Sequence, residues 1–304
     1  MNRVIPTKTN RTKGTIAMRK RIYMLLWLAG CLALSLSAQQ TKELYLLHTS
    51  DTHSRIEPLA ADAADADAGK GGAARRAAFV RQFCAEHPNT LVLDCGDISQ
   101  GTPYYNFYKG EVEIRLMNLI GYDAMTIGNH EFDFGMDNLA RLFRMARFPV
   151  VCSNYDVTGT PLEGLVKPYV VIRRGGLRIG IFGLAPQPEG LIQADKCRGI
   201  VYKDPIPVAQ QMADLLRNEE DCDAVICLSH LGIRGIDPAS ASDEKLVAAT
   251  SGIDAILGGH SHTFMKEPAF YSNAKGQKTP VFHTGRNGVY VGEWKLTLTP
   301  TKKN

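Results

Sequence analysis

Short apolar runs that end in Gly, Asp, Asn or His recur along this sequence of 304 residues, and helical stretches follow many of them. The runs are rich in β-branched residues, a pattern typical of buried strands. Strands are predicted at Glu43 to Thr49, Thr90 to Cys95, Asp123 to Ile127, Pro149 to Ser153, Ala224 to Leu228, Ile253 to Leu257, Pro280 to His283 and Tyr290 to Thr297, with a hairpin of Tyr169 to Arg173 and Leu177 to Gly183. Helices are predicted at Ala73 to Glu86, Val112 to Ile120, Asp137 to Ala146, Pro207 to Arg217 and Glu244 to Thr250. This order predicts α/β layers around a largely buried sheet, with no linker to mark a domain boundary.

Five predicted strand ends carry polar motifs. They are Asp51-x-His53, Gly96-Asp97, Gly128-Asn129-His130-Glu131, His230 and Gly259-His260-Ser261-His262. In extended backbone an i, i+2 spacing puts both side chains on one face. Five of the eight histidines lie in these motifs. Any one motif could be a turn or a helix cap, but five strand ends of this kind together predict a metal site.

The predicted ligands are carboxylates, imidazoles and one amide, without a thiolate. This set suits Zn, Mn, Mg, Co or Fe better than a softer ion. Seven candidate ligands exceed the needs of one tetrahedral ion, so two divalent ions are predicted, with Asp97 as the bridging carboxylate. A pair of ions roughly 3.5–4 Å apart can clamp the oxygens of a phosphoryl group.

The ordered set of motifs resembles the signature of the calcineurin-like metallophosphatases. The longer forms, such as Leu47-His48-Thr49-Ser50-Asp51-Thr52-His53 and Gly128-Asn129-His130-Glu131-Phe132-Asp133-Phe134-Gly135, resemble its 5′-nucleotidase branch. The resemblance covers about residues 44 to 298. It implies a single-domain, four-layer α/β/β/α sandwich and a di-metal phosphohydrolase that acts on nucleoside 5′-monophosphates or related phosphate esters through a metal-bound hydroxide.

By motif position the resemblance also implies residue roles. One ion would be held by Asp51, His53, Asp97 and His262, and the other by Asp97, Asn129, His230 and His260. Asn129 would also contact the substrate. The catalytic pair would be a cationic His130, which stabilises charge on the phosphoryl group or leaving oxygen, and Asp133, which orients the ring and raises its pKa. Glu131 has no implied role beyond a supporting or structural one.

Members of the 5′-nucleotidase branch usually continue into a second domain that recognises the nucleotide, and this sequence ends at Asn304. The nucleotide-recognition domain is therefore expected to be absent. One alternative is a metal-binding half-subunit that needs a separate chain carrying the substrate domain. Another is a phosphodiesterase or nucleotide-sugar hydrolase. Residues 57–72, expected to form a mobile loop, and the aromatic run at 104–108 could contact substrate, or the run could simply pack under a loop.

The first 38 residues differ from the rest, with seven cations and no acid. Met18-Arg19-Lys20-Arg21 followed by apolar Ile22 to Leu36 is typical of an export signal, with Met18 as an alternative start and cleavage at Ala38. The apolar run is short for a stable membrane span of roughly 20 residues. Leu28-Ala29-Gly30-Cys31 resembles a lipobox, so a lipid anchor at Cys31 is the alternative to cleavage. The predicted location is periplasmic or cell-surface, with residues 39–304 as the metallophosphatase domain.

Charge and cysteine content follow from this division. The 35 cations of the whole sequence fall to 28 after cleavage, against 31 acids. The basic balance therefore belongs to the export signal and gives no support for binding a nucleic-acid polymer. Six cysteines remain, and Cys95, Cys152 and Cys227 lie in apolar runs where burial is expected.

Overall fold

The computed structural model describes residues 41–235 and 240–299. Contacts divide the chain into Met1–Gln40 and Thr41–Asn304, and all the described residues belong to the second unit. The predicted export signal, including Cys31, lies outside them. Among the helices of the described ranges, none combines the length and apolar character needed to cross a bilayer.

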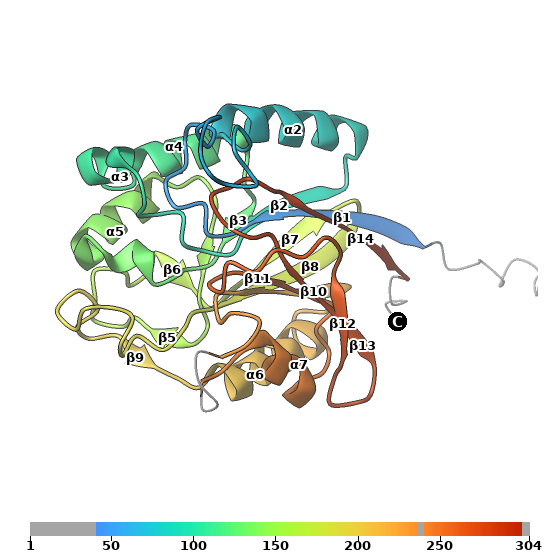
Figure 1. Ribbon diagram of the computed structural model, residues 1–304. Coiled ribbons are helices and arrows are strands. Elements are labelled where there is room, and N and C mark those ends of the chain that lie inside the picture. Colours follow the sequence, from blue (N-terminus) through green and yellow to red (C-terminus); the bar gives the residue numbers. More distant parts are fainter. Residues whose placement is uncertain (1–40, 236–239, 300–304) are drawn as a thin grey trace, which may run out of the picture. The chain divides into compact units, whose positions relative to one another are not determined.

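Two six-stranded sheets form the centre of the domain (Figure 1). The first has the order β14 (Gly292–Leu298), β1 (Lys42–Thr49), β2 (Thr90–Asp94), β3 (Ala124–Met125), β4 (Val150–Val151) and β6 (Val166–Lys167). The second has the order β12 (Ala269–Ser272), β13 (Lys278–His283), β11 (Ala255–Gly258), β10 (Ala224–Ser229), β8 (Leu177–Leu184) and β7 (Tyr169–Arg174). The short strands β5 (Tyr155–Asp156) and β9 (Val201–Tyr202) pair separately.

Helices cover the outer face of each sheet (Figure 1). On the first sheet they are α2 (Ala73–Glu86), α3 (Pro103–Tyr108), α4 (Glu111–Ile120) and α5 (Gly135–Met145). On the second they are α6 (Pro205–Asn218) and α7 (Asp243–Ala249). Three buried apolar clusters separate the four layers: helices on the first sheet, the two sheets on each other, and the second sheet on α6 and α7. The predicted α/β/β/α sandwich is confirmed.

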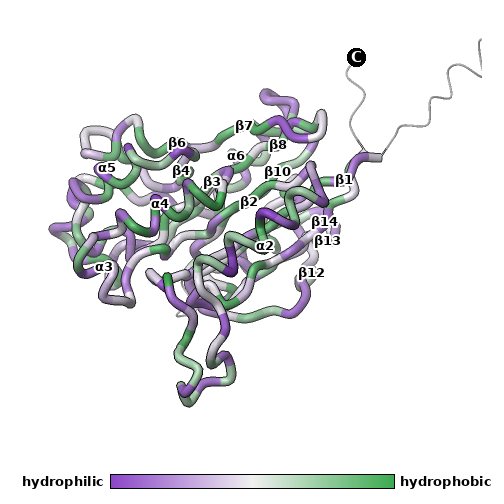
Figure 2. The backbone as a smooth tube through the Cα atoms, turned by 90° about the horizontal axis from the view of Figure 1, so that it is seen from above, coloured by the Kyte–Doolittle hydropathy of each residue, from purple (hydrophilic) through white to green (hydrophobic). Residues whose placement is uncertain are grey.

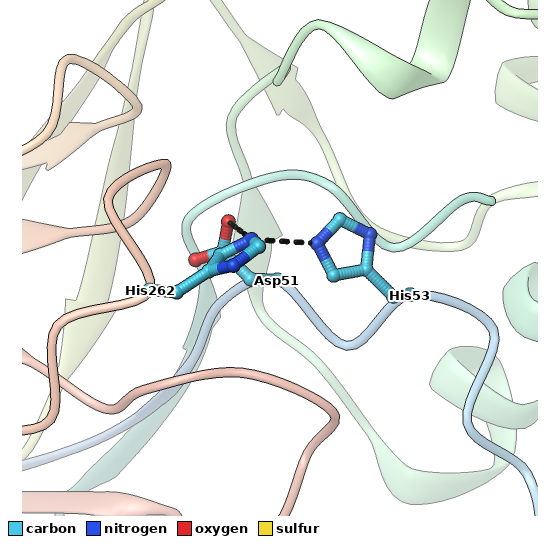
Figure 3. Close-up of side chains that lie close together, drawn as sticks. All are labelled: Asp51, His53 and His262. Carbon is cyan, nitrogen blue, oxygen red and sulfur yellow. Dashed lines mark hydrogen bonds and ion pairs between the residues drawn. The ribbon is translucent and has the colours of Figure 1, made fainter. Parts of the chain in front are cut away.

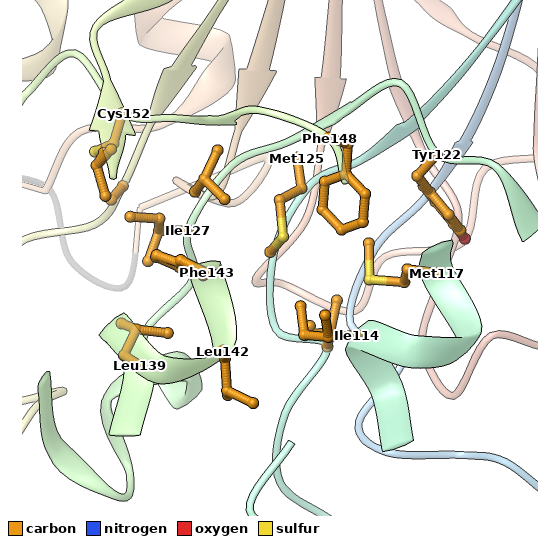
Figure 4. Packing of buried hydrophobic residues seen from close by; sticks show 14 of the residues in the cluster. Ile114, Met117, Tyr122, Met125, Ile127, Leu139, Leu142, Phe143, Phe148 and Cys152 are labelled. Atoms are coloured by element: carbon orange, nitrogen blue, oxygen red, sulfur yellow. The ribbon is translucent and has the colours of Figure 1, made fainter. Parts of the chain in front are cut away.

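Strand β1 shows why the sequence builds layers. Leu47 joins the cluster under the helices, whereas its neighbour Leu46 joins the cluster between the sheets. Successive side chains of a strand point to opposite faces, so a strand buried on both faces is apolar throughout. Figure 4 shows the helix-facing cluster, and in Figure 2 inner strands such as β2 and β10 are coloured as hydrophobic along much of their length.

Parallel pairing gathers the functional strand ends. β2 pairs in parallel with β1 and β3, and β10 pairs in parallel with β8 and β11. The carboxyl ends of parallel neighbours meet at one edge of a sheet, which is where open α/β sheets place their binding sites. The loops after β1, β2, β3, β10 and β11 carry the five polar motifs.

Helix α3 and the strands β5, β6, β9 and β12 were not predicted from the sequence. The aromatic run at 104–108 lies in helix α3, which begins at Pro103; it buries Tyr105 and leaves Phe107 79% exposed. Strand β12 pairs antiparallel with β13 at the sheet edge. The strand predicted at Asp123 to Ile127 is reduced to Ala124–Met125. Residues 57–72 hold neither helix nor strand, as expected.

The cysteines of the described ranges are all free. Cys95, Cys152 and Cys227 are buried, as their apolar surroundings predicted. Their thiol pKa values are raised by burial, so they act as small apolar side chains.

Candidate metal centre

Tight turns at the strand ends aim the polar side chains. Asp51, His53, Asp97, His260 and His262 have positive φ angles of 50°, 46°, 56°, 74° and 52°. Residues other than glycine seldom adopt this conformation, and such outliers cluster at functional sites. Five of the seven ligands proposed from the sequence share it.

Glycine allows the loops after β2 and β3 to touch. A Cβ added to Gly128 would lie 2.2 Å from Oδ1 of Asp97, and one added to Gly96 would lie 2.5 Å from the backbone nitrogen of Gly128. Any side chain at either position would push the two loops apart. The two Gly-containing motifs are therefore a packing requirement of the site.

The first ligand group consists of Asp51, His53 and His262, whose candidate ligand atoms all lie within 4.8 Å of one another (Figure 3). Nε2 of His53 lies 2.9 Å from Nε2 of His262, and the latter lies 3.5 Å from Oδ1 of Asp51. Nδ1 of His53 lies 3.2 Å from the carbonyl oxygen of Ser99. Because that carbonyl accepts the Nδ1–H, Nε2 is left as the coordinating atom.

The second group consists of Asp97, His230 and His260, again with ligand atoms within 4.8 Å of one another. Nε2 of the fully buried His230 lies 3.0 Å from Oδ2 of Asp97. Nδ1 of His230 lies 2.6 Å from the carbonyl oxygen of Cys95, which fixes the tautomer with Nε2 toward the carboxylates.

The electrostatics of this group favour a cation. Burial opposes protonation of His230, but the carboxylates of Asp97 and Asp51 outweigh it and raise its pKa to about 10. His260 shows the reverse, since burial and the neighbouring His230 lower its pKa to about 4. A bound divalent cation would take the place of the proton that the carboxylates attract.

A buried atom without a partner provides a test of whether metal ions fit here. Oδ1 of Asn129 is buried and makes no hydrogen bond with any described residue. A buried acceptor left unpaired is unfavourable, and this oxygen is a good ligand for a divalent cation. The residues present therefore fit two metal ions.

The two groups lie next to each other. Oδ1 of Asp51 is 3.5 Å from Nε2 of His262 and 3.9 Å from Nε2 of His230, so Asp51 stands between them. Asp97, predicted from sequence as the bridging ligand, falls in the second group. Its bridging role stays a prediction.

His130 and Asp133 contact each other beside the ligand groups. Nδ1 of His130 lies 3.1 Å from Oδ2 of Asp133, across the 3₁₀ turn η1 (His130–Phe132). Their side chains are 34% and 37% exposed, so a ligand from solvent can reach them. The hydrogen bond that His130 donates to the carboxylate of Asp133 is the main cause that raises the pKa of His130. The ring of His130 lies 5.5 Å from that of His53.

Glu131, which sequence reasoning left unassigned, holds the loops together. Its Oε2 accepts from the backbone N–H groups of Asp97 at 2.9 Å and Gly128 at 2.6 Å. Its Oε1 accepts from those of Ile98 at 2.9 Å and Ser99 at 3.3 Å. The only sequence signal was its place two residues after a proposed ligand.

A second group of hydrogen-bonded residues supports the loop that carries His230. Asp243, at the start of α7, pairs through Oδ2 with Nε2 of His283 at 2.7 Å and through Oδ1 with the hydroxyl of Ser229 at 2.5 Å. Its backbone N–H donates to the carbonyl of Gly232 at 2.9 Å. The carboxylate therefore ties the end of β10, where His230 begins its loop, to the end of β13. Sequence reasoning missed Asp243, since nothing local links it to residues 14 and 40 positions away.

A four-layer α/β/β/α sandwich with two adjacent His/Asp ligand groups at the strand ends defines the class of metallophosphoesterases. The model of the calcineurin-like phosphoesterase family matches residues 44–264, and the chain belongs to this family. Its enzymes are phosphoester hydrolases that use two divalent metal ions, a number that agrees with the two ligand groups. The resemblance inferred from the motifs is confirmed.

Within this family, the chain is similar in sequence to proteins named 5′-nucleotidase. A rat 5′-nucleotidase is 33% identical over 90% of this chain and 49% of its own length, and the human 5′-nucleotidase is 32% identical over 84% and 46%. The chain thus spans about half the length of these curated relatives.

Solved structures of nucleotidases and calcineurin-like phosphoesterases have a similar fold. A 5′-nucleotidase precursor from Thermus thermophilus superposes with a TM-score of 0.74 at 33% identity, covering 84% of this chain and 51% of that one. A Haemophilus influenzae NAD nucleotidase reaches 0.74 at 26% identity over 86% and 48%. The calcineurin-like phosphoesterase YfkN from Bacillus subtilis reaches 0.70 at 28% identity over 85% and 86%.

Proposed function

We propose that this chain is a di-metal phosphohydrolase that releases phosphate from nucleoside 5′-monophosphates or related phosphate esters. The observation that carries the proposal is the convergence of two His/Asp ligand groups next to the His130–Asp133 pair. The names of its relatives, which match along most of this chain, support the substrate class.

The residues that would hold the ions follow from the two groups. Asp51, His53 and His262 would bind one ion and Asp97, His230, His260 and Asn129 the other, with Asp97 reaching both. When bound, two divalent ions supply a water-derived nucleophile and neutralise charge on the phosphoryl oxygens.

His130 acts on the substrate from the solvent side of the site. Held by Asp133, its ring remains protonated to higher pH and can hydrogen-bond the phosphoryl group or donate a proton from Nε2 to the leaving oxygen. The backbone N–H of His130 donates to Oδ1 of Asp97 at 2.8 Å, which fixes the ring relative to the ligand groups. Asn129 would contact the same phosphoryl group.

A cavity of about 510 Å³ next to His260 can take the organic part of the substrate. Gln187, Tyr202 and Leu231 are among the residues that line it. An aromatic ring beside polar side chains suits a group with both a flat apolar face and hydrogen-bonding edges. This cavity supports a nucleoside ester over a simple alkyl phosphate.

The test is phosphate release from AMP by the purified chain, with and without EDTA, followed by titration with Zn²⁺, Mn²⁺, Mg²⁺ and Co²⁺. Activity is expected to disappear with EDTA and to return with at least one ion. A folded chain that loads metal but releases no phosphate from AMP or a chromogenic phosphomonoester contradicts the proposal.

A second candidate is a metal-binding half-subunit that needs a separate chain carrying the substrate domain. The chain spans 49% of the length of the rat relative. Activity that rises from near zero when a substrate-domain chain is added would establish this candidate. Full activity of the isolated chain would exclude it.

A third candidate is a phosphodiesterase or nucleotide-sugar hydrolase, favoured by the similarity to the protein named NAD nucleotidase. Rates on AMP, 2′,3′-cyclic AMP and UDP-glucose separate these activities. Preference for AMP supports the phosphomonoesterase.

We also propose that the protein is exported to the periplasm or cell surface by its first 38 residues, whose basic and apolar segments motivate the assignment. Mass spectrometry of the mature protein decides between cleavage after Ala38 and a lipidated Cys31. An intact N-terminus in the cytoplasmic fraction would contradict export.

A further inference from the structure

A second pocket lies between the start of α2 and the segment that leads into β14, with a volume of about 300 Å³. Its lining residues are Gly71, Gly72, Arg75, Arg76, Phe79 and the run 288–291. Two arginines line it and no carboxylate does. None of the seven proposed metal ligands belongs to it, so it is separate from the metal centre.

Arg76 is the residue that lacks a partner. Only 8% of the residue is exposed, yet Nε and Nη1 make no hydrogen bond with any residue that the structure describes. A buried guanidinium without a counter-charge is strongly unfavourable. A buried guanidinium is therefore expected to pair with a negatively charged group.

The described residues do not supply that group. The charge of Arg76 does act on Asp94: burial raises the pKa of this carboxyl, and Arg76 is the smallest of the effects that lower it. The oxygens of Asp94 are already used, however: Oδ2 accepts from the hydroxyl of Thr49 at 2.6 Å and Oδ1 from the backbone N–H of Gly96 at 2.9 Å. Asp94 forms no direct ion pair with Arg76.

Gly288 makes the space for the guanidinium. Its φ is +57°, and a Cβ there would lie 2.1 Å from Nη1 of Arg76. Gly288 and Arg76 both line the pocket, and Nη1 of Arg76 occupies the place that a Cβ of residue 288 would take. A residue with a side chain at position 288 would exclude the guanidinium from this place.

The first turn of α2 adds a second source of positive potential. The helix has 14 residues, its N-cap is Gly72 without a capping side chain, and its first turn holds no acid. The backbone N–H of Ala73 already donates to the carbonyl of Ile56 at 2.8 Å, so the later N–H groups of this turn are the ones that can attract an anion. Nη1 of Arg75 donates to the carbonyl of Gly69 at 2.6 Å, which holds a second guanidinium at the same end.

We propose that this pocket, the Arg76 pocket, binds a phosphate-type oxyanion, with the guanidinium of Arg76 as its counter-charge and the first turn of α2 completing the site. A planar guanidinium matches two oxygens of such an anion. The ligand is free phosphate or the phosphate group of an ester, for which Phe79 and Tyr290 offer aromatic walls. The proposal does not depend on the activity of the metal centre.

The test uses the full chain stripped of metal with EDTA and titrated with inorganic phosphate. A ligand that binds only the native state raises the Tm with the logarithm of its concentration. We expect this rise for the unaltered chain and for Arg81→Met, an exposed arginine of the same helix, and its loss in Arg76→Met. The affinity of Arg76→Met should fall tenfold or more, about the value of a charged hydrogen bond.

The stability of the variants in phosphate-free buffer provides an independent test. Because Arg76 is unpaired when the pocket holds no anion, Arg76→Met should be at least as stable as the unaltered chain in phosphate-free buffer. Arg76→Lys keeps the charge but loses the planar set of guanidinium donors. It should bind phosphate more weakly than the unaltered chain and more tightly than Arg76→Met.

If Arg76→Met is strongly destabilised and phosphate stabilises all variants alike, Arg76 serves as an internal counter-charge to Asp94 and the proposal is wrong. Phenyl phosphate distinguishes the two ligand sources: tighter binding than phosphate, lost in Phe79→Ala, indicates an ester, and equal binding indicates the free anion.

Discussion

The backbone N–H of His130 donates to Oδ1 of Asp97 at 2.8 Å, and the carboxylate of Glu131 accepts from the backbone N–H of Asp97 at 2.9 Å. Each loop thus binds a carboxylate supplied by the other. These hydrogen bonds fix the proposed bridging ligand and the proposed catalytic histidine relative to each other. A substitution in either loop should therefore shift the position of both residues.

Asp97→Asn should lose both metal content and turnover. The amide removes a negative charge beside His230, and with it the attraction for a cation in the second group. Metal analysis after dialysis, together with phosphate release from AMP, measures both effects. Asp137→Asn in the first turn of α5 is the control and should match the unaltered chain. Retention of two ions by Asp97→Asn would contradict the bridging role.

His130→Ala should keep its metal ions but slow turnover by roughly 10²–10⁴-fold, the range for a general acid–base group. Loss of metal in this variant would show that His130 is a ligand.

Asp133→Asn should shift the alkaline limb of the rate profile to lower pH. The bond to Asp133 raises the pKa of His130, so the cationic form survives to higher pH in the unaltered chain. Without the carboxylate the proton is lost at lower pH. A profile of kcat against pH checks the direction, and an unmoved limb would remove Asp133 from the role assigned to it.

Glu131→Gln should weaken metal binding roughly 10–100-fold, the range for groups that orient ligands. Its amide nitrogen would face backbone donors that now share a carboxylate. Metal affinity by competition with a chelator is the measurement, with circular dichroism to confirm folding. Glu86→Gln, exposed at the end of α2, is the control. An unchanged affinity in folded Glu131→Gln would show that the four hydrogen bonds serve stability alone.

His48 should make the domain sensitive to acid. It is fully buried in β1, and burial, with a smaller effect of His283, lowers its pKa to about 3. The unfolded chain protonates near its ordinary pKa of 6.5 while the native state does not, so stability is full above that pH and falls as pH drops toward 3. The slope is about 1.4 kcal/mol per pH unit for one proton.

Urea unfolding of the metal-free chain between pH 7 and pH 4 measures this slope. His48→Gln should show a shallower pH dependence whatever its stability at pH 7, whereas His87→Gln, on the partly exposed stack with Tyr45, should not. Parallel curves for His48→Gln and the unaltered chain would place the acid sensitivity elsewhere.

The sequence by itself predicted the layers and the residues of the candidate site. Apolar runs fix which segments become buried strands, and polar residues just after them must lie at a sheet edge, since parallel pairing brings carboxyl ends together. Asp51, His53, Asp97, His230 and His262 could be found this way because strand periodicity is a local property.

Only the tertiary structure decided what supports those residues. Glu131 reaches backbone amides 34 positions away, and Asp243 joins Ser229 to His283 across two strand ends. The same holds for Arg76. Its helical position suggests only a basic surface, but packing against Gly288 leaves Nε and Nη1 buried without a hydrogen bond to any described residue. Local patterns specify which face of an element is buried, but the partners that meet there depend on how distant elements pack.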